Sequence, residues 1–294
     1  MASNDSVCAF CAGALRPTVD APRSSYAELG RYRVEACEQC GAGATVPRPT
    51  TQELAECYAS SYGYATHDLI EHEKRRRAAA LLDWAGVRTG KILDVGCMFG
   101  FLLDEARDRG LEPHGIELSA EPAAAAAANG HTVFTGTIEQ YAETHTHRFA
   151  AIFAQHVLEH IPDPLEFLEA ARGLLEPGGQ LVICVPNFEA RLRKLAPSSW
   201  GWYQVPVHLH HFSSRALHRL LGDAGFSVSE ERRRGGYTLF LLLSAMQSLG
   251  LSVGGNTGSG GGALTRTALR VIGEVTRPYY SLGDDELAIV ARAS

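Results

Sequence analysis

Short apolar runs alternate with helix-like segments through the middle of the 294-residue chain. Runs that predict buried strands lie at Ile92–Val95, Pro113–Glu117, Thr132–Phe134, Ala150–Ala154 and Leu181–Val185. Helical spacing appears between them, for example at Ala123–Ala128 and Pro164–Leu175, and two later strands are predicted at Phe226–Arg232 and Leu287–Ala291. The alternation predicts an α/β fold with a seven-stranded Rossmann-like sheet covered by helices on both faces.

The first of these strands runs directly into a glycine-rich turn. Gly96 and Gly100 follow Val95, and helical spacing resumes at Phe101. A strand, a glycine-rich turn and a helix start form a pocket of backbone N–H groups that can hold a nucleotide or a nucleoside bearing a carboxylate. Glu117 ends the next strand about 20 residues on, where an acid is placed to bind ribose hydroxyls. An ordinary strand-to-helix turn is the alternative.

Four cysteines near the N-terminus form two Cys-x-x-Cys pairs. Cys8 and Cys11 make the first pair, and Cys37 and Cys40 the second. This spacing predicts a zinc ribbon, in which four thiolates leave no open position on the ion, so the zinc would be structural. Redox dithiols are the alternative.

Charge and hydropathy narrow the class of partner. The formal net charge is -6, and the ribbon shows no basic stripe, which argues against nucleic acid as the main partner. No apolar run approaches 20 residues, and the polar N-terminus lacks a signal core. We therefore expect a cytoplasmic protein with no membrane partner.

The stretch Leu93-Asp94-Val95-Gly96-Cys97-x-x-Gly100 resembles the nucleotide loop of class I S-adenosylmethionine-dependent methyltransferases. Met98 stands where that family often has glycine. The resemblance implies that Asp94 lies near the methionine end of the cofactor and that Thr137 and Ile138 meet the adenine; Thr137 as a plain helix cap is the alternative. The cofactor-binding residues it implies are Asp94, Gly96, Cys97, Gly100, Glu117, Leu118, Thr137, Ile138 and Gln155.

The region before the sheet resembles a methyltransferase subgroup that includes nucleotide-sugar C-methyltransferases of antibiotic pathways. The ribbon, Pro47-Arg48-Pro49-Thr50 and the Tyr62-x-Tyr64 element carry this resemblance. It implies that Tyr64 closes over cofactor and substrate. Two departures are the absence of that group's C-terminal domain and the valines at 205 and 207, where the group carries Tyr and Glu.

Two histidine-bearing segments are candidates for proton transfer. Alignment on Phe212-Ser213 places His208 on the histidine of the sugar enzymes, and we predict that it is the general base. His156 follows the fourth strand, where the strand tip would face the methyl group, and is the second candidate. Packing and capping, or metal binding by the His-x-His-His cluster, are the alternatives for the later segment.

Taken together, the patterns divide the chain into three parts. These are a zinc ribbon at 1–50, a helical linker or lid at 51–90, and a methyltransferase domain at 91–294 with a flexible glycine-rich loop at 254–262. We expect a monomer or homodimer that methylates a carbon, oxygen or nitrogen of a small biosynthetic intermediate. The alternatives are an RNA or protein methyltransferase that reads its substrate with the ribbon, and a non-catalytic cofactor-binding scaffold.

Overall fold

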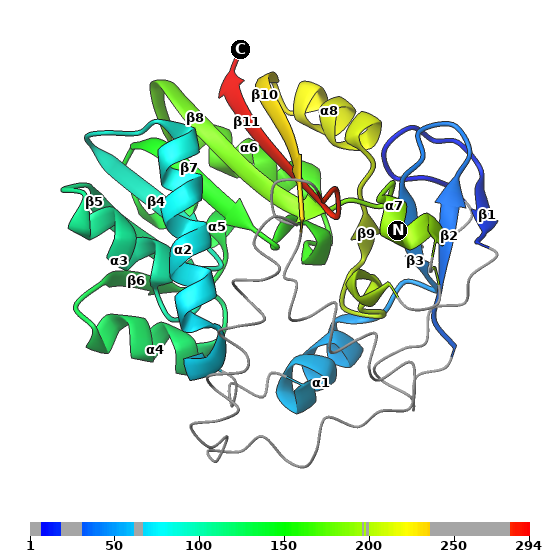
Figure 1. Ribbon diagram of the computed structural model, residues 1–294, viewed down its shortest axis with the longest axis horizontal. Coiled ribbons are helices and arrows are strands. Elements are labelled where there is room, and N and C mark those ends of the chain that lie inside the picture. Colours follow the sequence, from blue (N-terminus) through cyan, green and yellow to red (C-terminus); the bar gives the residue numbers. More distant parts are fainter. Residues whose placement is uncertain (1–6, 19–30, 62–66, 196, 198–199, 236–282) are drawn as a thin grey trace. The chain divides into compact units, whose positions relative to one another are not determined.

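The computed structural model describes residues 7–18, 31–61, 67–195, 197, 200–235 and 283–294 (Figure 1). Tyr64 and the glycine-rich segment 254–262 lie outside the described residues. The chain divides into two compact units. We call them the ribbon unit, made of 1–69, 186–217 and 233–287, and the sheet unit, made of 70–185, 218–232 and 288–294.

The sheet unit is built on a seven-stranded sheet, which confirms the predicted α/β fold. Its strand order is β10-β11-β8-β7-β4-β5-β6, and the neighbours from β8 to β6 pair in parallel. In chain order the strands are β4 (Lys91–Val95), β5 (Glu112–Glu117), β6 (Thr132–Thr135), β7 (Phe149–Gln155), β8 (Leu175–Pro186), β10 (Phe226–Arg234) and β11 (Glu286–Ala293).

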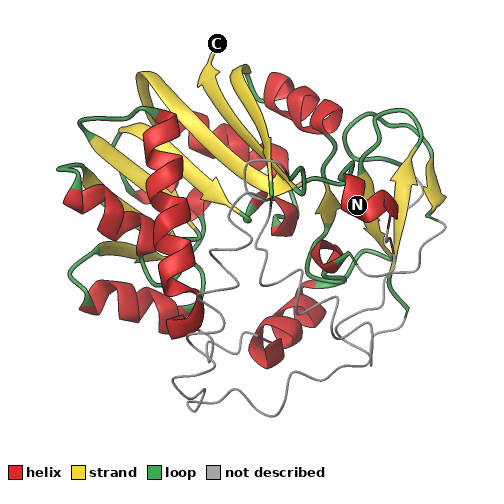
Figure 2. Ribbon diagram, viewed as in Figure 1, coloured by secondary structure: helices red, strands yellow, loops and turns green. Residues whose placement is uncertain are grey.

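Helices cover the sheet because its central strands are apolar on both faces. Leu81 and Leu82 of α2 pack with Ile92 of β4 and Phe153 of β7 in one fully buried cluster. Figure 2 shows α2 crossing in front of the strands, with α6 behind them. The helices here are α2 (His67–Ala85), α3 (Phe101–Asp108), α4 (Ala120–Ala128), α5 (Ile138–Thr144), α6 (Pro164–Leu174) and α8 (Ser214–Asp223), with a 3-10 turn η3 at Leu158–His160.

The stretch Glu176-Pro177-Gly178-Gly179, whose sequence is typical of a turn before a strand, is part of a strand. Residues 176–179 belong to β8, whose register with β7 jumps from Phe149 opposite Leu175 to Ala151 opposite Gln180. Gly178 takes a φ of 82°, in the left-handed region that glycine enters without strain. The Pro-Gly-Gly sequence therefore forms an irregularity within the strand, and pairing resumes on both sides of it.

The ribbon unit holds a small antiparallel sheet in the order β1-β2-β3-β9. Its strands are β1 (Leu15–Pro17), β2 (Arg33–Cys37), β3 (Gly43–Val46) and β9 (His210–His211). The last strand comes from far along the chain, with His211 opposite Gly43. The described part of the unit also contains helices α1 (Thr51–Ser61) and α7 (Arg191–Leu195) and a 3-10 turn at Gly201–Tyr203. One core cluster there includes Tyr32, Val34, Phe188, Trp200 and Trp202.

Candidate functional site

The glycine-rich turn between β4 and α3 is held by the backbone of the next strand. The N–H groups of Gly96 and Cys97 both donate to the carbonyl of Ile116, at 2.8 and 3.1 Å. Gly96 has a φ of 73°, and a Cβ there would lie 2.6 Å from Cγ2 of Val157. Backbone conformation and lack of space therefore both require glycine at this position.

Met98 stands where the resemblance implies a glycine. Its φ is 48°, in the left-handed region that favours glycine, which is a physical reason for glycine to suit this position. The side chain is accommodated, with its sulfur 3.3 Å from Nζ of Lys74. The Met98 N–H donates to Oε2 of Glu117 at 2.9 Å, so the backbone of the loop keeps its shape with methionine in place.

Glu117 stands at the end of β5 with both carboxylate oxygens oriented. Oε2 accepts from Met98, and Oε1 accepts from the N–H of Ser119 at 2.8 Å. The residue is 7% exposed. A carboxylate fixed in this way at the tip of the second strand has the chemistry to accept hydrogen bonds from a ribose diol.

Asp94, on β4, is a buried acid beside a second acid. Burial, and then the charge of Glu117, raise the pKa of Asp94 to about 8, while Lys74 partly offsets this. A cationic group bound next to Asp94 would favour its ionised form and lower that pKa. The pair therefore suits a ligand that brings a positive charge and a diol, as S-adenosylmethionine does.

The other residues expected to bind cofactor differ in what they do within the protein. The Cys97 thiol is buried, with its pKa raised by burial and by the neighbouring acids. Thr137 caps α5 in a reciprocal capping box with Gln140, so its side chain serves the alternative predicted for it. Ile138 is buried, whereas Leu118 is 66% exposed beside Glu117. An adenine contact at these positions stays a prediction.

The segment after β7 carries a strained histidine and a buried acid. Gln155 ends the strand, and His156 follows with a φ of 53°. Nδ1 of His156 lies 3.3 Å from Oε1 of Glu159, which is 0% exposed. From the sequence, Glu159 suggests mainly an architectural role, with substrate contact or chemistry as the alternative. Its position three residues after a histidine at a strand tip is a signal for the second of these.

The three histidines at 208, 210 and 211 are all buried in the ribbon unit, and each has a different polar neighbour. Nδ1 of His208 donates to the carbonyl of Trp202 at 2.8 Å. His210 meets Arg48 through Nε2 at 2.9 Å, and His211 lies 3.2 Å from Oγ1 of Thr45. Burial, and then Arg193, lower the pKa of His211 to about 3. Because the three histidines contact different groups, their arrangement fits a packing role better than joint binding of one metal ion.

The four ribbon cysteines come together as their spacing predicts. Their sulfur atoms all lie within 4.8 Å of one another, with Cys8 3.5 Å from Cys40 and Cys11 3.4 Å from Cys37. Tetrahedral zinc with bonds of about 2.3 Å places sulfurs about 3.8 Å apart, so the cluster fits that ion. At Cys37, burial is outweighed by the Cys40 N–H and the Cys11 thiol, which lower the pKa of the Cys37 thiol to about 7.

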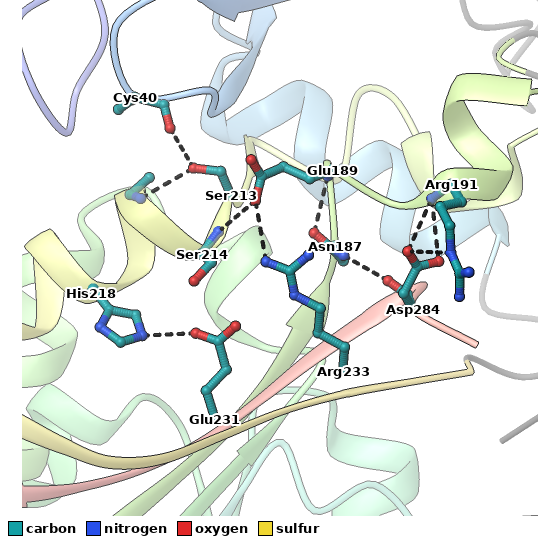
Figure 3. A network of polar contacts seen from close by, with 11 residues as sticks. Cys40, Asn187, Glu189, Arg191, Ser213, Ser214, His218, Glu231, Arg233 and Asp284 are labelled. Atoms are coloured by element: carbon teal, nitrogen blue, oxygen red, sulfur yellow. Dashed lines mark hydrogen bonds and ion pairs between the residues drawn. The ribbon is translucent and has the colours of Figure 1, made fainter. Parts of the chain in front are cut away.

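A polar network ties the ribbon to later parts of the same unit (Figure 3). Oγ of Ser213 donates to the carbonyl of Cys40 at 2.6 Å and accepts from the N–H of Ala216 at 3.1 Å. Glu189 accepts from the N–H of Ser214 and pairs with Arg233. A serine directly before helical spacing is typical of a helix cap, and Ser213 caps α8 in this way. The sequence did not reveal Glu189, which belongs to no recognisable motif.

Comparison with solved structures supports the fold of the chain. A chain of the complex containing the Haloferax volcanii Trm112 methyltransferase activator superposes with a TM-score of 0.54 at 19% identity, covering 82% of this chain and 97% of that one. Haemonchus contortus phosphoethanolamine N-methyltransferase 2 gives 0.56 at 16% identity, covering 85% and 62%. The fold and the loop together define the class, a class I S-adenosylmethionine-dependent methyltransferase domain.

The family follows from sequence. A family model described as a methyltransferase domain matches residues 67–231, more than half of the chain, and the chain belongs to that family. A relative, the ubiquinone biosynthesis O-methyltransferase of Sodalis glossinidius (strain morsitans), is 31% identical over 127 residues, which is 40% of this chain and 50% of the relative. The chain thus spans about half the length of the curated relatives it matches. Among the described residues, no helix is long and apolar enough to cross a membrane.

Proposed function

We propose that the protein transfers a methyl group from S-adenosylmethionine to a small biosynthetic molecule. The observation that carries the proposal is the paired arrangement of the buried acids Asp94 and Glu117 beside the glycine-rich turn, in a chain of the methyltransferase family. The printed name of the curated relative, a ubiquinone biosynthesis O-methyltransferase, supports a small-molecule acceptor.

The chain's own residues hold the cofactor in this proposal. Glu117 binds the ribose, Asp94 faces the cationic methionine end, and Gly96, Cys97 and Gly100 supply the turn. Leu118, Thr137 and Ile138 surround the adenine, and Gln155 lies toward the methyl group. The positive sulfonium supplies the activated methyl, so the protein has to align the acceptor and remove a proton where the acceptor carries one.

Two histidines serve as candidate proton acceptors, with Tyr64 as a positioning residue. The hydrogen bond from Nδ1 of His208 to the Trp202 carbonyl leaves the other ring nitrogen as the basic one, which supports the base role we assign to it. His156 is the second candidate. We expect His208→Ala to keep cofactor affinity and lose most turnover, measured by calorimetry and by methyl transfer. An unchanged rate would remove His208 as the base.

The proposed function also includes a structural zinc ion, held by Cys8, Cys11, Cys37 and Cys40. The fit of the sulfur cluster to a tetrahedral site supports it. A ribbon of three short N-terminal strands buries little apolar surface, so an ion at this point would hold its two turns together. With four protein ligands, the ion takes no part in methyl transfer.

The test follows the methyl group itself. Purified protein is incubated with methyl-labelled S-adenosylmethionine and with bacterial extract separated into small-molecule, RNA and protein fractions. Label in the small-molecule fraction, located by mass fragmentation, is the expected result and identifies the acceptor atom as carbon, oxygen or nitrogen. A sugar or other secondary metabolite is the acceptor class that the ribbon subgroup suggests. Label in RNA or protein would contradict the proposal.

A further inference from the structure

We propose that Glu159 is a positioning residue that orients His156 for proton transfer at the methyl-transfer centre. The inference rests on the proposed methyl transfer and extends it. It concerns the second of the two candidate bases, His156, and an acceptor that carries an X–H group to be deprotonated. A fully buried acid three residues from a histidine in a left-handed conformation is the juxtaposition that carries the proposal.

The pair lies at the edge of the sheet where the cofactor turn begins. His156 directly follows β7, which pairs in parallel with β4, the strand that ends in the glycine turn. Val157 is packed so closely on that turn that a Cβ on Gly96 would lie 2.6 Å from it. Because ligands bind at the carboxyl ends of parallel strands in such sheets, His156 is next to the position of the methionine end.

The backbone of this segment is held in an unfavourable conformation. A φ of 53° at His156 is uncommon for a residue with a Cβ, and the His156 N–H is fixed at 2.8 Å from the carbonyl of Cys184. The 3-10 turn η3 follows at Leu158–His160 and carries Glu159, whose Oε1 lies 3.3 Å from Nδ1 of His156. The strained backbone places the imidazole of His156 at the tip of β7. Backbone strain of this kind is concentrated at functional sites.

The chemistry of the pair follows from its burial. A carboxylate with no exposure to solvent needs a nearby donor or positive charge, and Nδ1 of His156 is 3.3 Å from Oε1 of Glu159. The carboxylate favours the tautomer with hydrogen on Nδ1, so Nε2 keeps its lone pair. When Nε2 takes the acceptor's proton, the imidazolium is balanced by Glu159, and the proton later leaves to water.

A double-mutant cycle tests the inference. His156→Ala, Glu159→Gln and the combined variant are compared by turnover, by KM for the acceptor and by calorimetric cofactor affinity. Glu166→Gln is the matched control, because Glu166 is an exposed acid at the start of α6. We expect Glu159→Gln to lower kcat about 100-fold with KM and cofactor affinity within about threefold, and we expect the double variant to be no slower than His156→Ala. If the two single-variant losses of kcat multiply in the double variant, the proposal is wrong. It is also wrong if Glu159→Gln has the same kcat as Glu166→Gln.

A spectroscopic arm separates this inference from the methyl-transfer proposal. Nitrogen-15 NMR of the His156 ring reports its tautomer without turnover. The wild type should show hydrogen on Nδ1, and Glu159→Gln should shift the ring toward the other tautomer, with Glu159→Asp partly restoring it. If the spectrum of the His156 ring is unchanged in Glu159→Gln, Glu159 does not orient the ring, even if methyl transfer is confirmed. A wild type without turnover but with the expected tautomer shift contradicts the activity alone.

Discussion

The four-cysteine cluster and the cofactor turn are both short glycine-containing loops, but they are stabilised by different means. The turn from Gly96 to Gly100 follows β4 and is hydrogen-bonded to β5. Strand β4 carries fully buried side chains, such as Ile92 and Leu93 at 0% exposure. The strands next to the cysteine cluster are only three to five residues long. A loop backed by a large core can be held by hydrogen bonds to the neighbouring strand, whereas we expect a loop with a small core to bind a stabilising ion through its own side chains.

The largest expected effect is loss of the ribbon's zinc. Cys11→Ser removes one of four ligands, and zinc peptides of this kind bind their ion with an apparent free energy of about 10–16 kcal/mol. We expect about one zinc per chain in the wild type, well below that in the variant, and a large fall in melting temperature. Metal analysis with calorimetry measures both.

Cys57→Ser is the control for that experiment, because Cys57 is a buried thiol outside the cluster. It should keep its zinc. A wild type that contains no zinc would contradict the contrast between the two loops, since the ribbon would then be holding itself together by packing alone.

The next largest effect concerns the carboxylate of the cofactor turn. Glu117→Ala removes the acceptor of two backbone N–H groups and the proposed ribose ligand. We expect the Kd for S-adenosylmethionine to rise about 100-fold, or about 2.7 kcal/mol. Glu112→Ala, at the exposed start of the same strand, should bind as the wild type does in the same titration. Equal affinities for both variants would show that Glu117 does not bind the ribose.

A smaller effect separates strain from crowding at the turn. Gly96→Ala places a methyl 2.6 Å from Val157 at a φ of 73°, while Gly110→Ala meets nothing within 4 Å at a φ of 78°. We expect unfolding free energy to fall by about 1 kcal/mol at Gly110 and by about 2–4 kcal/mol at Gly96. Denaturant titration measures both, and Val157→Ala should restore part of the loss at Gly96. Equal losses at the two glycines would remove the packing argument.

The last expected effect is a change in stability with pH. The folded pKa of Asp94 is raised to about 8, above its unfolded value, so the folded protein without cofactor keeps a proton that the unfolded chain has lost. Stability should therefore fall as pH rises from about 4 to 8, by at most about 1.4 kcal/mol per pH unit from this group. Asp94→Asn should show a flatter profile in that window. Parallel profiles for the two proteins would show that Asp94 is ionised throughout.

Most of the fold follows from local pattern, because strands of the large sheet are short apolar runs and its cofactor turn is marked by glycines. The cysteine cluster could also be predicted from the sequence, because the spacing of the cysteines within each pair is a local property. Residues 176–179 differ, because Pro and Gly are locally typical of a turn, while the backbone pairing on both sides that keeps these residues in β8 is not local. Tertiary pairing overrides residue preference there.

The candidate site was harder to predict where burial decides a residue's role. Glu159 looks like a surface acid in sequence, yet it is fully buried beside His156. Strand β9 was missed because two histidines carry no alternation, and its partner Gly43 lies in the first fifty residues. Both features depend on chain segments that meet only in the folded protein.

The pairing of β9 with β3 has a consequence for how the protein is made. Gly43 and Ala44 leave the ribosome long before His210 and His211, yet the four strands form one sheet. Although N-terminal segments usually fold first during synthesis, this one must wait for most of the chain before its last strand is paired. Until then the edge of β3 is unpaired and open to other chains. Early capture of zinc by the four cysteines would protect the nascent ribbon through that interval.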